Sequence, residues 1–352
     1  MIQQLNLNGF TNFGESDFVF SKGINVFIGK NGTGKTHILK CLAATIDANN
    51  SFSKSHTQAK DRFEALIAEK LIGYFKPEQL GRLVKRQQGR SNATISIKVK
   101  NKNISYSFAT NSKTSVKIDN NGGVPLMSSL YIPPREMFSL FEGFLSTYEK
   151  RELSFDETYV MLVKSLNANT LKGPRYDNIK DLIEHLEEKL EIKVLKENGR
   201  FYIRDKHGKL EAHLVAEGIR KLASIMYLIT NGELNKNTIL FWDEPEANLN
   251  PALIKVVADF IVLLANKGIQ VFIASHDYLL THLLSIQAEY SQIEKAPEMK
   301  FFSLKKNEDL MSTESADDLT KLEINPILDE YAAYFDLEQE YSRRLFESKI
   351  KY

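Results

Sequence analysis

The chain of 352 residues contains a single cysteine, Cys41, which excludes an internal disulfide and any zinc cluster or redox pair built from thiols. It also lacks an excess of either charge, because 46 Lys and Arg residues nearly balance 45 Asp and Glu residues. The chain therefore does not have the overall positive charge expected of a protein that acts mainly on nucleic acid. A local basic patch is compatible with this near-zero net charge. With 43% hydrophobic and 26% charged residues, the composition is that of a globular protein.

Long hydrophobic runs are absent as well. The most apolar stretch, residues 252–265, is interrupted by Lys255 and Asp259 and is shorter than the roughly 20 residues that cross a bilayer. The N-terminus has no basic segment followed by an apolar core, so it does not resemble a signal peptide. We therefore expect a cytoplasmic protein with no membrane partner.

Hydrophobic periodicity predicts a mixed α/β chain without internal repeats. Strands are predicted over 2–7, 17–20, 24–28, 93–99, 104–109, 115–118, 129–132, 238–242 and 269–274. Helices are predicted over 37–47, 63–85, 219–228 and 254–264, with an exposed connection at 51–62. A helical segment should run from the Pro133-Pro134 break to about 193, and Asn198-Gly199 predicts a hairpin between 194–195 and 201–204. In the tail, residues 323–346 should form one or two helices docked on the domain.

Residues 29–36 read GKNGTGKT and match the phosphate-binding pattern GxxxxGK[ST] in full, between a predicted strand and a predicted helix. Its glycines let backbone N–H groups turn toward phosphates, and the following helix presents its positive end to them. Lys35 should reach the β- and γ-phosphates of ATP, and the Thr36 hydroxyl should bind Mg²⁺. The predicted nucleotide-binding residues here are Gly29, Lys30, Asn31, Gly32, Thr33, Gly34, Lys35 and Thr36. A glycine-rich turn without a ligand would not explain this position between strand and helix.

Residues 238–245, TILFWDEP, form an apolar strand that ends in two adjacent carboxylates. Asp243 can hold the Mg²⁺ shell, while Glu244 can orient and deprotonate the attacking water as general base. A solvated acidic turn would explain the pair alone, but not its position after a buried strand in a chain with a P-loop. The two motifs together predict an ATPase whose catalytic residues include Lys35 and Glu244.

The segment DEPEANLNP at 243–251, followed by Ser275-His276 after another strand, resembles the ABC-type ATPases. Within them it is similar to the branch of the overcoming-lysogenization-defect, RecF and SMC-like proteins, as is the opening Asn12-Phe13 with GINVFIG at 23–29. The resemblance covers roughly 1–109 and 126–304. It implies that 246–250 is the D-loop at a dimer interface and that His276 is the switch histidine at the γ-phosphate. Without the surrounding motif, His276 would be interpreted as a core histidine.

Two further family motifs are assigned with alternatives left open. The segment VAEGIRK at 215–221 lies where the LSGGQ signature is expected, but Ala216 replaces its serine and Glu217 its first glycine. Gly218, Arg220 and Lys221 remain as candidate phosphate contacts, and an ordinary helix start is the alternative. Glu136, just after 132–135, lies where the family has a metal- and water-sensing glutamine, and an exposed first-turn glutamate is equally consistent.

The resemblance implies an α/β P-loop NTPase fold of the ABC head type, with a mixed sheet, an antiparallel β subregion and a helical insert. We divide the chain into an N-terminal ATPase part (1–134), the helical insert (135–193), a C-terminal ATPase part (194–305) and a helical extension (306–352). The overcoming-lysogenization-defect proteins carry a Toprim domain of about a hundred residues or more, for which 306–352 is too short. Any nuclease or toxin should therefore be a separate chain.

Two functions from different classes follow. The first is an ATP-gated regulator or scaffold that forms a head-to-tail dimer and holds a separate effector protein, such as a nuclease or toxin, in bacterial anti-phage defence. The alternative is a DNA repair or recombination ATPase that binds DNA directly, for which Lys85, Arg86 and Arg90 supply a small basic cluster. Solvated charge at a helix end would explain the same cluster. A transporter motor is disfavoured by the departure from LSGGQ.

Overall fold

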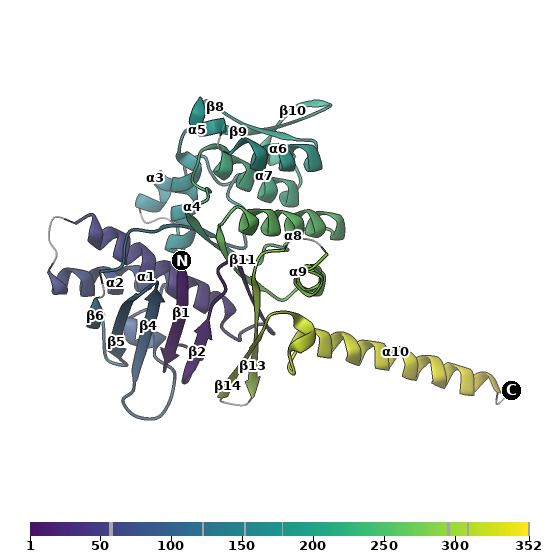
Figure 1. Ribbon diagram of the computed structural model, residues 1–352, viewed down its shortest axis with the longest axis horizontal. Helices are drawn as coiled ribbons and strands as arrows, with labels where there is room; N and C mark the ends of the chain where they lie inside the picture. The colour runs from purple at the N-terminus through teal and green to yellow at the C-terminus, as the bar shows by residue number, and fades with distance from the viewer. Residues whose placement is uncertain are drawn as a thin grey trace.

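The computed structural model describes residues 1–55, 59–121, 123–150, 153–177, 179–293, 296–307 and 310–350. Its centre is a six-stranded sheet in the order β14-β13-β3-β12-β11-β7. A five-stranded antiparallel sheet covers one side together with two helices, and further helices cover the other side (Figure 1). This arrangement agrees with the mixed sheet and the antiparallel β subregion that the resemblance implies.

The central sheet is parallel except at one edge. Strand β3 (Ile24–Ile28) pairs in parallel with β12 (Gln270–Ser275) and with β13 (Met299–Asn307). Strand β11 (Thr238–Asp243) lies in parallel between β12 and β7 (Ser128–Ile132). The carboxyl ends of all five strands therefore meet at one edge, which is where open α/β sheets bind ligands.

Alternate residues of these strands enter two different cores. Val26 of β3 and Trp242 of β11 belong to one buried cluster, while Phe27 and Phe241 belong to the other. The first cluster packs under α7, α8, α9 and the insert, and the second packs under α1, α2 and the antiparallel sheet. Burial on both faces explains why β3 and β11 are mostly apolar and lack a regular polar alternation, although β3 includes the buried polar residue Asn25.

The antiparallel sheet has the order β2-β1-β4-β5-β6 and confirms the predicted β subregion. Its strands are β1 (Ile2–Asn8), β2 (Ser16–Val19), β4 (Asn92–Val99), β5 (Lys102–Ala109) and β6 (Lys117–Asn121). In β4 the side chains alternate strictly between buried and more exposed positions. One face of this sheet therefore closes the core over α1.

Helix α1 (Lys35–Ser53) and helix α2 (Lys60–Phe75) differ in length from the prediction. Helix α1 continues beyond 47 into the expected connection, of which 56–58 lie outside the described residues. The predicted helix over 63–85 is wrong in its second half, because Lys76 takes a left-handed conformation with φ 49° and ends α2. A short turn, η1 (Leu80–Leu83), and a loop follow, so the basic cluster 85–90 lies in a loop and not at a helix end.

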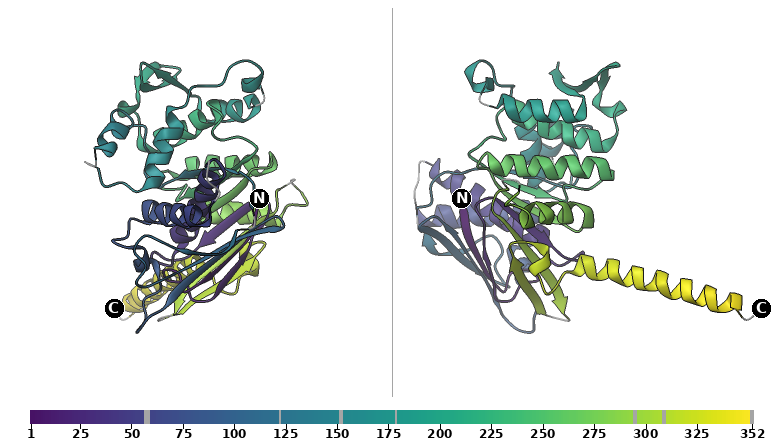
Figure 2. Two further views of the ribbon diagram at one scale, coloured as in Figure 1. Left: turned by 90° about the vertical axis from the view of Figure 1, so that its left-hand side faces the viewer. Right: turned by 45° about the vertical axis from the view of Figure 1, so that its right-hand side comes forward.

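The insert is a set of short helices: α3 (Phe144–Glu149), α4 (Glu157–Asn167), α5 (Pro174–Asp177) and α6 (Lys180–Leu190). The predicted hairpin is confirmed as β8 (Lys193–Glu197) and β9 (Arg200–Asp205), with positive φ at Asn198 and Gly199. The sequence did not predict a third strand, β10 (Gly208–Glu211), or the turn η2 (Ala212–Leu214). Figure 2 shows α6 and the three strands, in teal, beyond α8 on the side away from the antiparallel sheet, whereas α4 contacts β7 of the central sheet.

After the insert come α7 (Glu217–Thr230), α8 (Pro251–Asn266) and α9 (Tyr278–Glu289). The region 306–352 is not wholly helical as expected, because β14 (Leu310–Ala316) adds an antiparallel strand to β13. A turn, η3 (Leu319–Lys321), leads to α10 (Pro326–Ile350).

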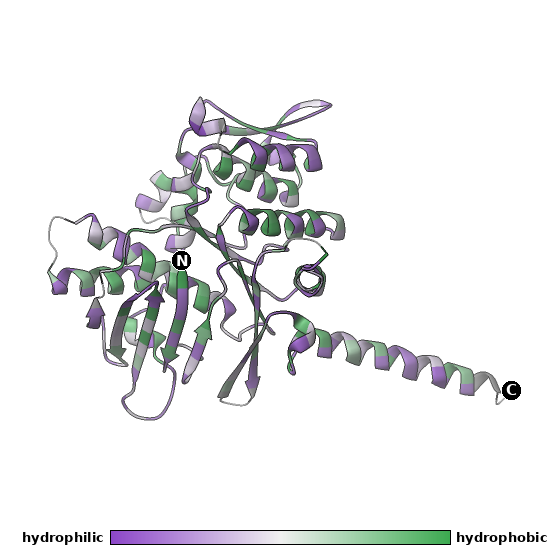
Figure 3. Ribbon diagram, viewed as in Figure 1, coloured by the Kyte–Doolittle hydropathy of each residue, from purple (hydrophilic) through white to green (hydrophobic). Residues whose placement is uncertain are grey.

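Helix α10 corrects the expectation of a docked tail. Only its beginning contacts the body, and the rest projects away from it with hydrophobic and hydrophilic residues alternating along its length (Figure 3). Exposed large side chains on it include Tyr334, Phe335 and Tyr341, each about 60% exposed or more. No helix within the described residues is both long and apolar enough to span a bilayer.

Candidate functional site

The P-loop joins β3 to α1 at the carboxyl edge of the central sheet. Gly32 and Gly34 have φ of 78° and 96°, which residues with a Cβ rarely adopt. A Cβ on Gly34 would also lie 2.8 Å from the ring of Phe13, so this turn needs glycine. The Asn12 amide donates to the Gly32 carbonyl oxygen at 2.8 Å and fixes the loop from outside.

Lys35 is the first residue of α1 and is buried. Its Nζ donates to the carbonyl oxygens of Gly29, at 2.7 Å, and Lys30, at 3.1 Å. Burial lowers the pKa of this ammonium, although the carboxylates of Glu244 and Asp243 act in the opposite direction. The structure thus places a partly desolvated cation inside the loop, where anionic oxygens would strengthen its charged form.

Strand β11 brings Asp243 to the same place. The Thr36 hydroxyl donates to Asp243 Oδ1 at 2.9 Å, and the Tyr131 hydroxyl on β7 donates to Oδ2 at 3.1 Å. Burial raises the pKa of Asp243 to about 6 in spite of these two hydrogen bonds. A hydroxyl and a carboxylate side by side are hard oxygen donors, the ligand type that Mg²⁺ prefers. Tyr131 was not identified from the sequence, where it was one apolar residue of a strand.

Glu244 follows in a left-handed conformation with φ 49°. Its N–H donates to the Ala274 carbonyl oxygen at 2.9 Å, and its own carbonyl oxygen accepts from Lys221 Nζ at 2.5 Å. Lys221 is 2% exposed, and burial lowers its pKa to about 8. Lys221 on α7 therefore stabilises the backbone of Glu244. The sequence suggested Lys221 as an outward-facing phosphate contact, and the structure does not place it so.

His276 lies beside Glu244 at the end of β12. Its Nδ1 is 3.6 Å from Glu244 Oε1 and 3.8 Å from Glu246 Oε1, and its side chain is 44% exposed. Glu246 is buried and accepts from the Ser275 hydroxyl at 2.8 Å and from the His276 N–H at 3.3 Å, while burial raises its pKa. The structure thus brings together the predicted Glu244 and His276, and adds Glu246 as the residue that holds the histidine backbone.

Glu136 and Arg220 form an ion pair, with Glu136 Oε1 2.7 Å from Arg220 Nε. Glu136 also accepts from the Ser139 hydroxyl and from the N–H groups of Phe138 and Ser139, while Arg220 donates to the Val215 carbonyl oxygen at 2.6 Å. Both carboxylate oxygens are thus engaged, and this arrangement does not bring Glu136 to Thr36 and Asp243. The metal role of Glu136 and the phosphate contact by Arg220 each need a rearrangement and stay predictions.

The expected signature lies at the start of α7 and touches the expected D-loop of the same chain. The Asn248 amide donates to Glu217 Oε1 at 2.7 Å, which turns this carboxylate toward the D-loop. Gly218 is buried, and a Cβ there would lie 2.8 Å from the Asn248 carbonyl oxygen. Close packing therefore requires a glycine at position 218. Ala216 and Glu217, by contrast, are exposed at the start of this helix.

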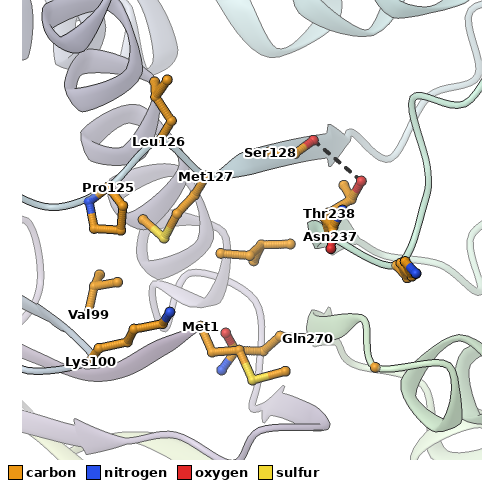
Figure 4. Close-up of a pocket in the computed structure, with 13 residues that line it drawn as sticks. Met1, Val99, Lys100, Pro125, Leu126, Met127, Ser128, Asn237, Thr238 and Gln270 are labelled. Atoms are coloured by element: carbon orange, nitrogen blue, oxygen red, sulfur yellow. Dashed lines mark hydrogen bonds between the residues drawn. The ribbon is translucent and has the colours of Figure 1, made fainter.

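A cavity of about 640 Å³ lies away from these groups (Figure 4). Its lining includes Ser128 and Thr238, the first residues of β7 and β11, which lie 3.4 Å apart through their hydroxyl oxygens. It therefore opens at the amino edge of the central sheet, opposite the P-loop. We assign no chemistry to it.

Comparison with known proteins identifies the family. The family described as "AAA domain, putative AbiEii toxin, Type IV TA system" matches residues 47–281, more than half of the chain. The chain belongs to this family. It is an ABC-type ATPase of the RecF/SMC-like branch, with the P-loop lying just before the matched residues.

Curated relatives match parts of this ABC-type ATPase. The DNA replication and repair protein RecF of Limosilactobacillus fermentum is 31% identical over 121 residues, which are 34% of this chain and 29% of that protein. RecF of Shouchella clausii is 31% identical over 77 residues, 22% of this chain and 18% of the relative. The chain thus aligns with less than a third of either relative's length.

Solved structures match the ABC-type ATPase over nearly its whole length. An SMC head bound to the C-winged helix domain of ScpA has a TM-score of 0.53 at 13% identity and covers 91% of this chain and 98% of its own. The SMC head from Pyrococcus furiosus with an extended coiled coil, bound to the C-terminal domain of ScpA, has a TM-score of 0.51 at 11% identity. It covers 91% of this chain and 97% of its own, and both likenesses concern the fold.

Proposed function

We propose that the chain hydrolyses ATP to ADP and phosphate at the carboxyl edge of its central sheet. The observation that carries this proposal is the hydrogen bond between Thr36 of the P-loop and Asp243 of β11, with Glu244 and His276 immediately beside it. A P-loop threonine, a buried carboxylate and a second, half-exposed carboxylate are the groups that phosphoryl transfer to water requires.

Each residue has a distinct task in this proposal. The backbone amides of 29–34 and the Lys35 ammonium bind the phosphates. Thr36 and Asp243 would hold Mg²⁺, which would supply positive charge to the site when bound. Glu244 accepts a proton from the attacking water. Lys221 fixes the Glu244 backbone, and His276 contacts the γ-phosphate.

An ATPase assay with matched variants tests this. Lys35→Ala should weaken ATP binding by roughly 100-fold. Glu244→Gln should bind ATP but release phosphate at least about 100-fold more slowly. Asp243→Asn should lose Mg²⁺ dependence. Glu340→Gln, on the exposed part of α10, is the control and should behave as the parent. Parent-like turnover in both carboxylate variants would place hydrolysis elsewhere.

We further propose that two copies form an ATP-dependent head-to-tail dimer, each covering the other's P-loop with the start of α7. Ala216 lacks the hydroxyl of the family's serine, so this dimer should be weaker than a serine would give, by about 1 kcal/mol for one hydrogen bond. Light scattering of Glu244→Gln with and without ATP measures it, and Ala216→Ser should shift the equilibrium toward dimer. A persistent monomer at high concentration with ATP would contradict this dimer.

The biological role that we propose is an ATP-gated regulator or scaffold for a separate effector protein, such as a nuclease or toxin, in bacterial anti-phage defence. Three points support it: the toxin–antitoxin system in the family's description, the protein partner of the SMC heads, and the exposed apolar residues of α10. Pull-downs from the native host with the parent, Lys35→Ala and Glu244→Gln test whether a soluble partner binds in a nucleotide-dependent way. ATP and partner should then change each other's affinity equally.

A DNA repair ATPase is the second candidate, because the curated relatives are DNA replication and repair proteins. Arg86 and Arg90 are exposed in the loop before β4 and supply the basic residues. Tight DNA binding that weakens steeply with salt, and that Arg86→Gln with Arg90→Gln reduces, would favour this function. Recovery of no soluble protein partner in any nucleotide state would favour it too.

A further inference from the structure

The beginning of α10 forms one wall of a cavity over the P-loop. This cavity has a volume of about 350 Å³ and lies between residues 29–31, His276 and the first turns of α10, including Glu330 and Tyr331. Ile327 anchors the helix because it is only 8% exposed and belongs to the larger core. The C-terminal helix, far from the P-loop in sequence, is therefore attached next to it.

Two contacts connect α10 to residues of the nucleotide site. Glu330 Oε2 accepts from Lys30 Nζ of the P-loop at 2.6 Å. The ring of Tyr331 lies 4.8 Å from that of Tyr278, which follows His276 by two residues. The Lys30 ammonium lowers the pKa of Glu330, so this carboxylate is ionised at neutral pH.

The position of the Glu330 carboxylate relates it to the γ-phosphate end of the nucleotide site. His276 lines the cavity and also lies 3.6 Å from Glu244, the proposed general base. The cavity therefore opens at the end of the site where the γ-phosphate would be attacked. ADP has no charge there, whereas ATP brings a phosphate that repels Glu330 and attracts Lys30.

We propose that Glu330 is a specificity-determining residue that distinguishes ATP from ADP and couples this distinction to α10. The γ-phosphate competes with Glu330 for Lys30, so ATP opens the ion pair and frees the first turn of α10, while ADP leaves it closed. This inference rests on the proposed nucleotide site. It makes the exposed arm of α10 the element that reports the nucleotide state to a partner.

Equilibrium binding of ATP and of ADP, each with Mg²⁺, to the hydrolysis-deficient Glu244→Gln protein tests the role of Glu330. Adding Glu330→Gln should tighten ATP binding by roughly 2- to 5-fold, the scale of an exposed ion pair, and leave ADP binding unchanged. Adding Glu340→Gln should change neither affinity, because Glu340 is similarly exposed but lies farther along α10, away from the P-loop. The effect of Glu330→Gln should be smaller in a Lys30→Met background, because the contribution of the Lys30–Glu330 ion pair is then absent and only the direct repulsion of the phosphate remains.

A label on α10 tests the coupling separately. Cys41 is fully buried, so Gln339→Cys provides an accessible thiol for a fluorescent dye. ATP should lower the fluorescence anisotropy of this label and ADP should not, and Glu330→Gln should give the lower value without nucleotide.

The role of Glu330 would be overturned if Glu330→Gln changed the affinities for ATP and ADP equally or changed neither. It would also be overturned if ATP left the anisotropy of the label on α10 unchanged. Those outcomes leave the nucleotide site intact. A protein that binds neither nucleotide would overturn the site and this inference together.

Discussion

Asp243→Asn should stabilise the nucleotide-free protein at neutral pH while it impairs the site. Asp243 is 1% exposed, and burial raises its pKa from 3.8 to about 6. A difference of this size means that keeping the carboxylate ionised in the folded state costs about 3 kcal/mol. The asparagine removes this cost but has one acceptor oxygen in place of two. One of the Thr36 and Tyr131 hydroxyls must then accept from the amide NH2 instead of donating, a loss of about 1 kcal/mol. The net gain should be about 2 kcal/mol above pH 7.

The gain should depend on pH in a defined direction. Because the folded pKa lies above the unfolded one, the folded parent takes up a proton first as the pH falls, and its penalty disappears between about pH 6 and pH 4. Urea unfolding of parent and variant at pH 7.5 and pH 4.5 measures the difference. Asp336→Asn, at an exposed position of α10, is the control and should change little at either pH.

Two results would refute this reasoning. One is a variant that is less stable than the parent at pH 7.5, and the other is a difference that stays constant between the two pH values. The same variant should lose the gain in ATP affinity that Mg²⁺ gives the parent, since an amide is a weaker ligand than a carboxylate.

Three other substitutions test single contacts. Lys35→Ala should weaken ATP binding by roughly 100-fold in calorimetry, with unchanged circular dichroism, because the charged donor to the phosphates is lost. Lys221→Met should slow hydrolysis more than it weakens ADP binding, since its Nζ holds the Glu244 carbonyl oxygen, and equal effects on both would argue against this bracing role. Gly218→Ala should lower the free energy of unfolding by about 1–3 kcal/mol, because its Cβ would lie 2.8 Å from the Asn248 carbonyl oxygen, whereas unchanged stability would show that the D-loop moves freely.

Local patterns were enough to predict the elements that carry the site. The apolar runs of β3 and β11 and the P-loop glycines have strong signals within a few residues, so both strands were placed within a residue of their ends. The hairpin at Asn198-Gly199 also has a strong local signal, because its turn requires positive φ, although β8 is longer than the predicted 194–195.

Long-range contacts explain what the sequence did not predict. Tyr131 hydrogen bonds to Asp243 because β7 pairs with β11, and the sequence does not show which strands are neighbours. Lys221 is buried against the Glu244 backbone, although a lysine near a helix start is usually exposed. Glu330 meets Lys30 from 300 residues away, and the sequence pattern of α10 predicted docking where the helix projects.

Phosphate release from ATP by the parent and by Glu244→Gln, with ATP binding confirmed for both, tests the central claim most directly. We predict multiple turnovers by the parent, and a rate at least about 100-fold lower for the variant at similar ATP affinity. Equal rates, or no phosphate release by a parent that binds Mg–ATP, would contradict the assignment of hydrolysis to this site.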